Sequence, residues 1–147
     1  MTDEMKEQPK EQKAEELAEK PVVAKKKKIK RTVPTGHVHI QSTFNNTIVT
    51  FTDPKGNVLV STSAGACGFR GSKKSTAFAA QIAMDKASDI VKRTYGLSKV
   101  DVMVKGLGLG RDSAIRSLQS ANIFVETITD VSGLPHGGCR PRKARRV

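Results

Sequence analysis

Residues 99–111 read KVDVMVKGLGLGR, and this stretch decides the fold. Val100, Val102 and Val104 alternate with other side chains, which is typical of a strand with one buried face. A loop with glycine at every second position follows, and Arg111 begins a segment with helical spacing. A strand that leads through a tight loop into a helix is half of a β-α-β crossover, so the sequence predicts an α/β domain.

The segments on either side of this stretch extend the same pattern. Upstream, Ser75 is a favourable N-cap for a helix that reaches Tyr95, and Gly96 ends that helix. Downstream, the apolar spacing predicts a shorter helix over residues 111–122 and a last strand over residues 123–131.

Three further strands are expected near the start of the domain, over residues 37–44, 46–53 and 57–63. Asn45-Asn46 joins the first two strands, because asparagine tolerates the positive φ of a tight turn, and the DPKG sequence of residues 53–56 joins the last two. The expected order is therefore β-β-β-α-β-α-β, a mixed five-stranded sheet whose faces the two helices cover.

Most of the positive charge lies outside this domain. The chain has 147 residues and a formal net charge of +12 at pH 7. Residues 32–139 contribute only +4, whereas residues 21–31 contribute +6 and residues 140–147 contribute +5, and the first 20 residues contribute −3. A compact body with a basic arm at each end indicates a partner with a dense negative backbone, and nucleic acid is the leading candidate.

The charge pattern divides the chain into three parts. We expect a disordered, acidic-then-basic extension over residues 1–31, an α/β domain over residues 32–131 and an extended basic tail over residues 132–147. Cys67 and Cys139 share no metal or redox spacing, and no secretory segment or long apolar run is present. The sequence therefore predicts a cytosolic protein with reduced thiols.

The glycine-rich loop after Lys105 has the setting of a phosphate site, since it follows a strand and opens a helix. Three interpretations are open. A nucleotide cofactor is the weakest, because the third glycine of the dinucleotide fingerprint comes one residue early. The glycines Gly106, Gly108 and Gly110 could simply form a tight turn. The interpretation that fits best is an RNA phosphate held by Lys105 and Arg111.

A second loop, GFRGSKKST at residues 68–76, lies around the start of the long helix. It lacks the glycine spacing of a P-loop. Arg70, Lys73 and Lys74 are suited to pairing with phosphates, and Phe69 to stacking on a splayed base. Burial of Phe69 beneath its own loop is an equally good interpretation.

Metal chemistry is weakly indicated. His136 and Cys139 lie three residues apart without a second ligand pair, and His37 and His39 have no acidic partner at metal spacing.

Three aspartates near strand ends leave a nuclease open as the main alternative. Asp53, Asp101 and Asp130 could be carboxylates of a two-metal nuclease, although aspartate at a strand end is also ordinary turn chemistry. A third alternative is an architectural nucleic-acid binder that acts alone.

Four stretches resemble the ribosomal protein S-eleven family of the bacterial small subunit. They are FNNTIVTFTDPKGN (44–57), GFRGSKKST (68–76), VMVKGLGLGR (102–111) and ITDVSGLPHGGCRPRKARRV (128–147). The resemblance covers roughly residues 33–147. It departs from the family at the loop that commonly reads KGPGPGR, where this chain has Leu107 and Leu109, and at Gly137-Gly138, where Asn-Gly is common.

The resemblance implies a non-enzymatic structural protein of the small subunit that needs no cofactor. It implies a ribonuclease-H-like α/β sheet and a place on the platform, where the protein bridges several helices of 16S rRNA and borders the cleft that holds the Shine–Dalgarno duplex and the mRNA. Platform proteins S-seven and S-eighteen and initiation factor three are the neighbours that it implies.

The expected RNA contacts come from the basic arms, the two loops, the first turn and the shorter helix. They are Lys25, Lys26, Lys27, Lys28, Lys30, Arg31, Asn45, Asn46, Phe69, Arg70, Lys73, Lys74, Lys105, Gly106, Gly108, Gly110, Arg111, Arg116, His136, Arg140, Arg142, Lys143, Arg145 and Arg146.

Overall fold

The computed structural model describes residues 32–140 and 142–144 of the chain. The expected extension over residues 1–31 lies outside the described residues. So do eight of the expected RNA contacts: Lys25, Lys26, Lys27, Lys28, Lys30, Arg31, Arg145 and Arg146.

Five strands and two α-helices follow one another in the predicted order β-β-β-α-β-α-β, with one short 3-10 helix added. The elements are β1 (Thr35–Ser42), β2 (Thr47–Thr52), β3 (Val58–Ser63), the 3-10 helix η1 (Gly71–Ser75), α1 (Ala77–Tyr95), β4 (Lys99–Lys105), α2 (Gly110–Ser120) and β5 (Phe124–Asp130).

The strands form one mixed sheet in the order β3-β2-β1-β4-β5. The first three strands pair antiparallel, as short turns require, whereas β4 pairs parallel with both β1 and β5. His37 of β1 therefore lies between Thr52 of β2 and Asp101 of β4, two residues far apart in sequence.

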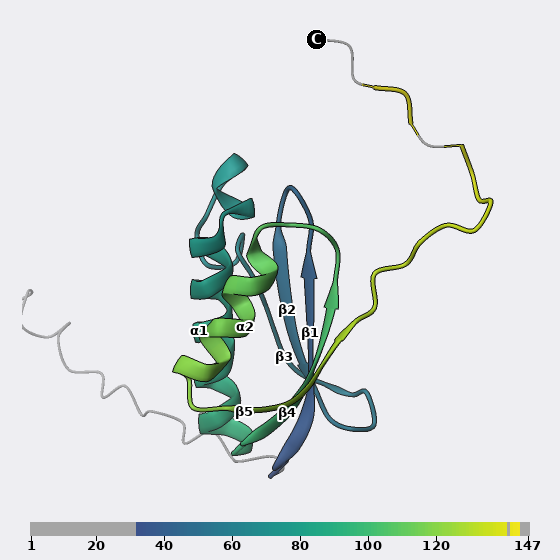
Figure 1. Ribbon diagram of the computed structural model, residues 1–147. Helices are drawn as coiled ribbons and strands as arrows, with labels where there is room; N and C mark the ends of the chain where they lie inside the picture. The colour runs from purple at the N-terminus through teal and green to yellow at the C-terminus, as the bar shows by residue number, and fades with distance from the viewer. Residues whose placement is uncertain (1–31, 141, 145–147) are drawn as a thin grey trace, which may run out of the picture.

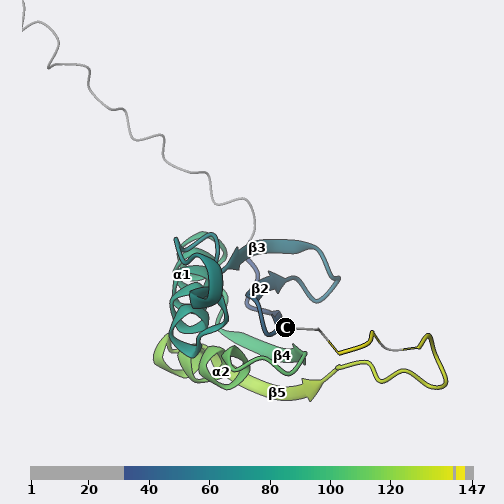
Figure 2. The same cartoon turned by 90° about the horizontal axis from the view of Figure 1, so that it is seen from above.

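Both helices cover the same face of the sheet, not one face each (Figures 1 and 2). Helix α1 packs over β2 and β3, and α2 packs beside it over β1 and the β5 edge. The connections β3-α1-β4 and β4-α2-β5 both move across the sheet in the same direction. When two right-handed strand–helix–strand connections step in the same direction across a sheet, their helices lie on the same face of that sheet. No helix of the described residues covers the other face of the sheet.

The core lies between this helical layer and the covered face of the sheet. Val100, Val102 and Val104 of β4 are fully buried, as their alternation predicted. Alanines on α1 face the sheet and allow the helix to approach it closely, while Phe51 and Met84 fill the larger spaces. The other buried apolar side chains of the cluster are Val33, Val38, Ile40, Val49, Ala87, Val91, Leu97, Ala114, Leu118 and Ile123.

The two ends of α1 agree only partly with the sequence prediction. Gly96 ends the helix in the left-handed conformation with φ 67°, as predicted. Ser75 is not the N-cap, however, because it is the last residue of η1 and its hydroxyl donates to the Ser72 carbonyl. Thr76 has the extended backbone of a cap, and its hydroxyl oxygen accepts from the N–H of Ala79 at 3.2 Å.

Candidate nucleic-acid interface

The segments predicted to bind RNA converge at one end of the sheet. Strands β1, β3, β4 and β5 run in the same direction, so the loops that follow them share an edge. These loops are residues 43–46, residues 64–76, residues 106–109 and the tail from residue 131 (Figure 1). Both α-helices also begin at this edge. The carboxyl ends of strands in open α/β sheets are where ligands usually bind.

The turn after β1 is built by Thr43, not by asparagine in a left-handed conformation. The Thr43 hydroxyl oxygen accepts from the N–H groups of Asn45 and Asn46. The side-chain oxygen of Asn46 accepts from the N–H of Thr47 at 3.0 Å. The predicted positive φ at Asn45-Asn46 is therefore wrong, since Asn122 is the only non-glycine residue with positive φ in the described part of the chain. Asn45 remains exposed, and Asn46 is half-buried in its own turn.

The basic loop before α1 is an ordered structure. The N–H groups of Cys67 and Phe69 donate to the carbonyl of Ala64, which folds the loop back on the end of β3. Arg70 and Lys73 are exposed, and Lys74 is half-buried. The first turn of α1 contains no acidic residue, so the positive end of the helix dipole adds to these cations.

Phe69 is half-buried and packs edge-to-face against Phe78, with ring centroids 6.0 Å apart and an interplanar angle of 89°. The interpretation that Phe69 is buried beneath its loop is thus met only in part, because the ring is packed but not covered, and its stacking on a base stays a prediction. Sequence reasoning missed Phe78, which is 61% exposed. Its position around the helix axis is the sequence signal of this exposure, because Phe78 falls outside the stripe of buried positions that begins at Ala79.

The glycines after β4 are needed because the loop lies directly on the β1–β2 turn. A side chain at Gly108 would meet Ser42 and the Thr43 carbonyl, and a side chain at Gly110 would meet Thr47 and Ala80. Only Gly106 has positive φ, at 101°. The glycines face the protein, so the tight-turn interpretation accounts for them and the nucleotide-cofactor interpretation gains no support. Leu107 and Leu109 point outward and are 74% and 78% exposed.

Arg111 connects this loop to β5. Its guanidinium donates to the Gly106 carbonyl at 3.1 Å and to the Asp130 carboxylate at 2.8 Å. The N–H of Ser132, and then the Arg111 guanidinium, lower the pKa of Asp130 to about 2. Lys105 is exposed at the end of β4, where it can approach a phosphate freely.

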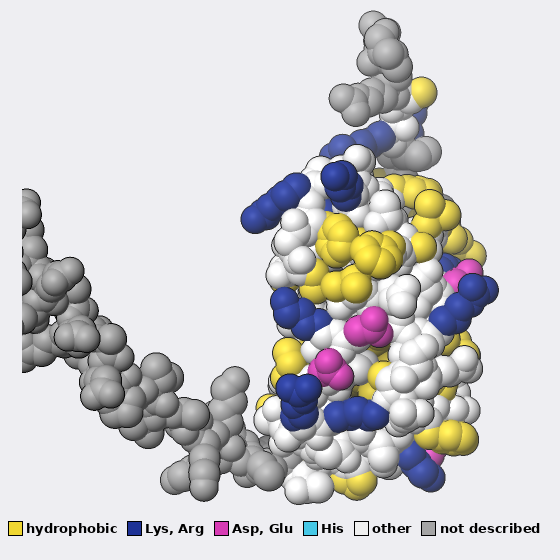
Figure 3. Space-filling view, turned by 90° about the vertical axis from the view of Figure 1, so that its left-hand side faces the viewer, with side chains coloured by type: hydrophobic (Ala, Val, Ile, Leu, Met, Phe, Trp, Pro, Cys, Tyr) yellow, Lys and Arg dark blue, Asp and Glu magenta, His cyan; other side chains and the backbone are white. Residues whose placement is uncertain are grey.

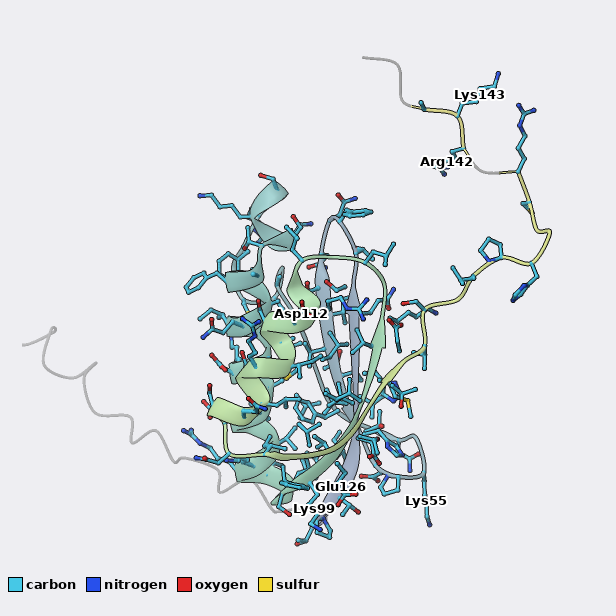
Figure 4. All side chains as sticks on the ribbon, viewed as in Figure 1. Lys55, Lys99, Asp112, Glu126, Arg142 and Lys143 are labelled. Atoms are coloured by element: carbon cyan, nitrogen blue, oxygen red, sulfur yellow. The ribbon has the colours of Figure 1, made fainter. Side chains whose placement is uncertain are left out.

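The remaining candidates lie farther from the loops. Arg116 is exposed in the middle of α2, away from the end of the sheet where the loops meet. The tail is fixed at its base, where the Ser132 hydroxyl accepts from the Gly106 N–H at 2.9 Å. Beyond that point it is extended and exposed, with Arg142 and Lys143 far from the body (Figure 4). His136 and Arg140 lie on the same exposed segment.

The three aspartates of the nuclease alternative do not come together. Asp53 and Asp101 lie toward the end of the sheet where β1 begins, whereas Asp130 lies at the opposite end, beside Val104. In residues 32–140 and 142–144, no group of three or more histidine, cysteine, aspartate or glutamate side chains could hold a metal ion. The geometry therefore gives the nuclease alternative no support.

His37 does have an acidic neighbour in space, although no acidic residue stands at metal spacing from it in the sequence. Its Nδ1 atom lies 3.5 Å from the Asp101 carboxylate, which also accepts from the Thr127 hydroxyl at 2.6 Å. The pairing of β1 with β4 creates this contact, and spacing along the chain could not reveal it. Next to it, burial and then the proximity of His37 lower the pKa of His39.

Two general expectations concern thiols and membranes. Cys67 and Cys139 are both free thiols, as predicted. Within the described residues, neither α-helix combines the length and the apolar character that crossing a bilayer requires.

Comparison with known proteins agrees with the resemblance that the motifs carry. Residues 36–146 match the family model described as ribosomal protein S11. The chain is 56% identical over 128 residues to the small ribosomal subunit protein uS11 of Francisella tularensis subsp. novicida strain U112, which covers 87% of this chain and 98% of the relative. The uS11 proteins of F. tularensis subsp. tularensis strain WY96-3418 and subsp. mediasiatica strain FSC147 match with the same identity and coverage. Because the family model spans most of the chain and the relatives are this similar over almost their full length, the chain belongs to the ribosomal protein S11 family.

Proposed function

We propose that this protein binds 16S rRNA on the platform of the small ribosomal subunit, where it bridges several rRNA helices and borders the cleft for the Shine–Dalgarno duplex and the mRNA. Family membership makes the protein a structural component of the small ribosomal subunit, which is cytoplasmic in bacteria. The platform position and the cleft are the parts that this proposal adds.

The observation that carries the proposal is the convergence of four separate segments at one end of the sheet. The β1–β2 turn, the basic loop, the glycine loop and the base of the tail would all face one RNA surface. The folded body between residues 32 and 139 has a charge of only +4. It can therefore position the protein on its rRNA site without binding every polyanion tightly.

The proposed mechanism is charge neutralisation at junctions between RNA helices. Loop cations such as Arg70, Lys73 and Lys105 contact phosphates beside the body, and the extended tail follows the RNA backbone away from it. Arg111 acts mainly through the loop, since Gly106 and Asp130 already occupy its guanidinium. The basic segments outside the described residues would add contacts of the same kind.

The neighbouring proteins on the ribosome are also part of this proposal, and they too rest on the family resemblance. Platform proteins S-seven and S-eighteen and initiation factor three are the partners that the family resemblance implies. The ribonuclease-H-like name for the fold likewise stays a prediction. The mixed five-stranded sheet with its β3-β2-β1-β4-β5 order supports it.

The test is binding of the full-length protein to a transcript of the 16S platform domain, beside an unrelated RNA of equal length, at about 150 mM salt. We expect a preference of about a thousandfold or more for the platform transcript, the lower end for specific recognition. Equal affinity for both RNAs would contradict a shaped rRNA site and would favour the architectural binder.

A further inference from the structure

We propose that Phe78 stacks on an unpaired nucleobase of the bound RNA, while Arg70, Lys73 and Lys74 hold the phosphates beside that base. The inference rests on the proposed function and deepens it. It identifies one contact on the interface and the RNA chemistry that this contact selects, a splayed base in a single-stranded loop.

The aromatic pair provides a rigid surface for stacking. Phe78 lies in the first turn of α1 and is 61% exposed, and its ring meets that of Phe69 edge-to-face at 6.0 Å. In such a pair, each ring keeps at least one face that the other does not cover. Phe69 is half-buried in a loop fixed by backbone hydrogen bonds, so it holds the Phe78 ring in place before any RNA arrives.

The charges around this pair select a polyanion. Residues 64–76 contain three cations and no acidic residue, and the first turn of α1 has none either. Figure 3 shows hydrophobic side chains gathered on the helical face, with Lys and Arg side chains on several sides of them and acidic side chains on one side. Single-stranded RNA offers both complements, a flat base for the ring and phosphates for the cations.

Other exposed apolar side chains of the described residues lack this combination. Phe44 in the β1–β2 turn is 76% exposed, but no described aromatic ring packs against it to hold it in place. Phe124 is 64% exposed, but the Lys99 ammonium lies 6.0 Å from its ring centroid and pairs with Glu126 at 3.3 Å. Figure 4 shows Lys99 and Glu126 together at the opposite end of the sheet. Leu107 and Leu109 have no aromatic face. Phe78 is therefore the side chain best suited to a base.

Phe124 also supplies the matched control, because the two phenylalanines are almost equally exposed. We expect Phe78→Ala to weaken binding of the full-length protein to a labelled platform-domain transcript by about 5- to 150-fold, the range for losing one stacked base. Phe124→Ala should leave the affinity unchanged.

Fluorescence provides a direct readout of stacking, because the chain contains no tryptophan. Phe78→Trp introduces a single indole with a larger stacking face and should retain the affinity. Its emission should be quenched as the transcript saturates the protein, whereas the emission of Phe124→Trp should not change.

The outcomes separate this inference from the proposed function. The stacking contact is overturned if Phe78→Ala binds RNA with normal affinity, or if the emission of Phe78→Trp is not quenched when the transcript saturates the protein. Neither result contradicts the proposed platform site. If Phe78→Ala binds RNA normally but no longer enters small subunits, the patch contacts a protein instead. If the unsubstituted protein shows no preference for the platform transcript, the proposed function fails and the inference fails with it.

Discussion

The guanidinium of Arg111 and the carboxylate of Asp130 lie 2.8 Å apart and join the start of α2 to the end of β5. The same guanidinium reaches the Gly106 carbonyl, so one side chain spans the glycine loop and closes it against the sheet. A cation at a nucleic-acid interface is usually interpreted as a phosphate ligand. Here its first role is to hold a loop that presents other groups.

We predict that Arg111→Gln raises the pKa of Asp130 without restoring its ordinary value of 3.8. The Ser132 N–H makes the largest contribution to the lowered pKa and would remain in the variant. Carbon-13 NMR titration of the Asp130 carboxyl measures the change. A value still at about 2 in the variant would show that Arg111 contributes nothing.

The lowered pKa also sets a pH window. Because the folded pKa lies below that of the unfolded chain, the ionised Asp130 stabilises the fold above pH 3.8, and this contribution is lost as the pH falls from 3.8 toward about 2. The stability difference between the native protein and Asp130→Asn should therefore shrink across that window. Urea denaturation at several pH values tests the trend, and a constant difference would contradict it.

Gly108→Ala should destabilise the fold, because a methyl group there would lie 2.5 Å from the Thr43 carbonyl oxygen. Overpacking of this kind typically lowers the free energy of unfolding by about 1–3 kcal/mol. Gly133→Ala is the control, since a methyl group at that position would meet nothing within 4 Å. Equal urea midpoints for the two variants would mean that the glycine loop does not lie on the β1–β2 turn as described.

Thr76→Ala should lower the free energy of unfolding by about 1 kcal/mol, the usual cost of losing an N-cap. Its hydroxyl oxygen accepts from the Ala79 N–H, whereas the neighbouring Ser75 hydroxyl only donates within η1. Ser75→Ala should thus cost clearly less. Thermal denaturation of both variants distinguishes the two caps, and a larger loss for Ser75→Ala would assign the cap to serine.

A chain that ends at Cys139 lacks five basic residues and should bind RNA with weaker salt dependence. If the tail neutralises about five phosphates, its removal should flatten the plot of log K against log salt concentration by about 4 units. Filter binding to the platform transcript at a series of salt concentrations gives the slope. An unchanged slope would show that the tail does not contact phosphates.

Local sequence patterns predicted the elements well but not their arrangement in space. The alternation of Val100, Val102 and Val104 identified a buried strand, and Gly96 marked the end of α1, because both signals depend on neighbouring residues. The placement of both helices on one face depends on the β3-β2-β1-β4-β5 order, which long-range pairing sets. Ser75 and Thr76 are both good caps by residue type, so only the fold could decide between them.

For the candidate interface as well, the sequence predicted the segments but not their arrangement in space. The sequence identified the loops from their glycines and cations, but their convergence depends on strand direction. The RNA contacts expected at Gly108 and Gly110 stay a prediction, and the structure adds what the sequence could not show, that these glycines pack closely on Ser42 and Ala80. Phe78 was missed because exposure of an aromatic side chain on a helix depends on what packs beside it, and α2 and the sheet cover only the opposite side of α1.

The loop between β4 and α2 has one side that packs on the protein and another side that faces solvent. Its even-numbered positions are glycines held against the β1–β2 turn, and its odd-numbered positions, Leu107 and Leu109, project into solvent. Substitutions at the two kinds of position should therefore have separable consequences. Changes at the outward positions can alter what the loop contacts while leaving stability intact, so this loop can change its recognition properties without a change in its backbone path.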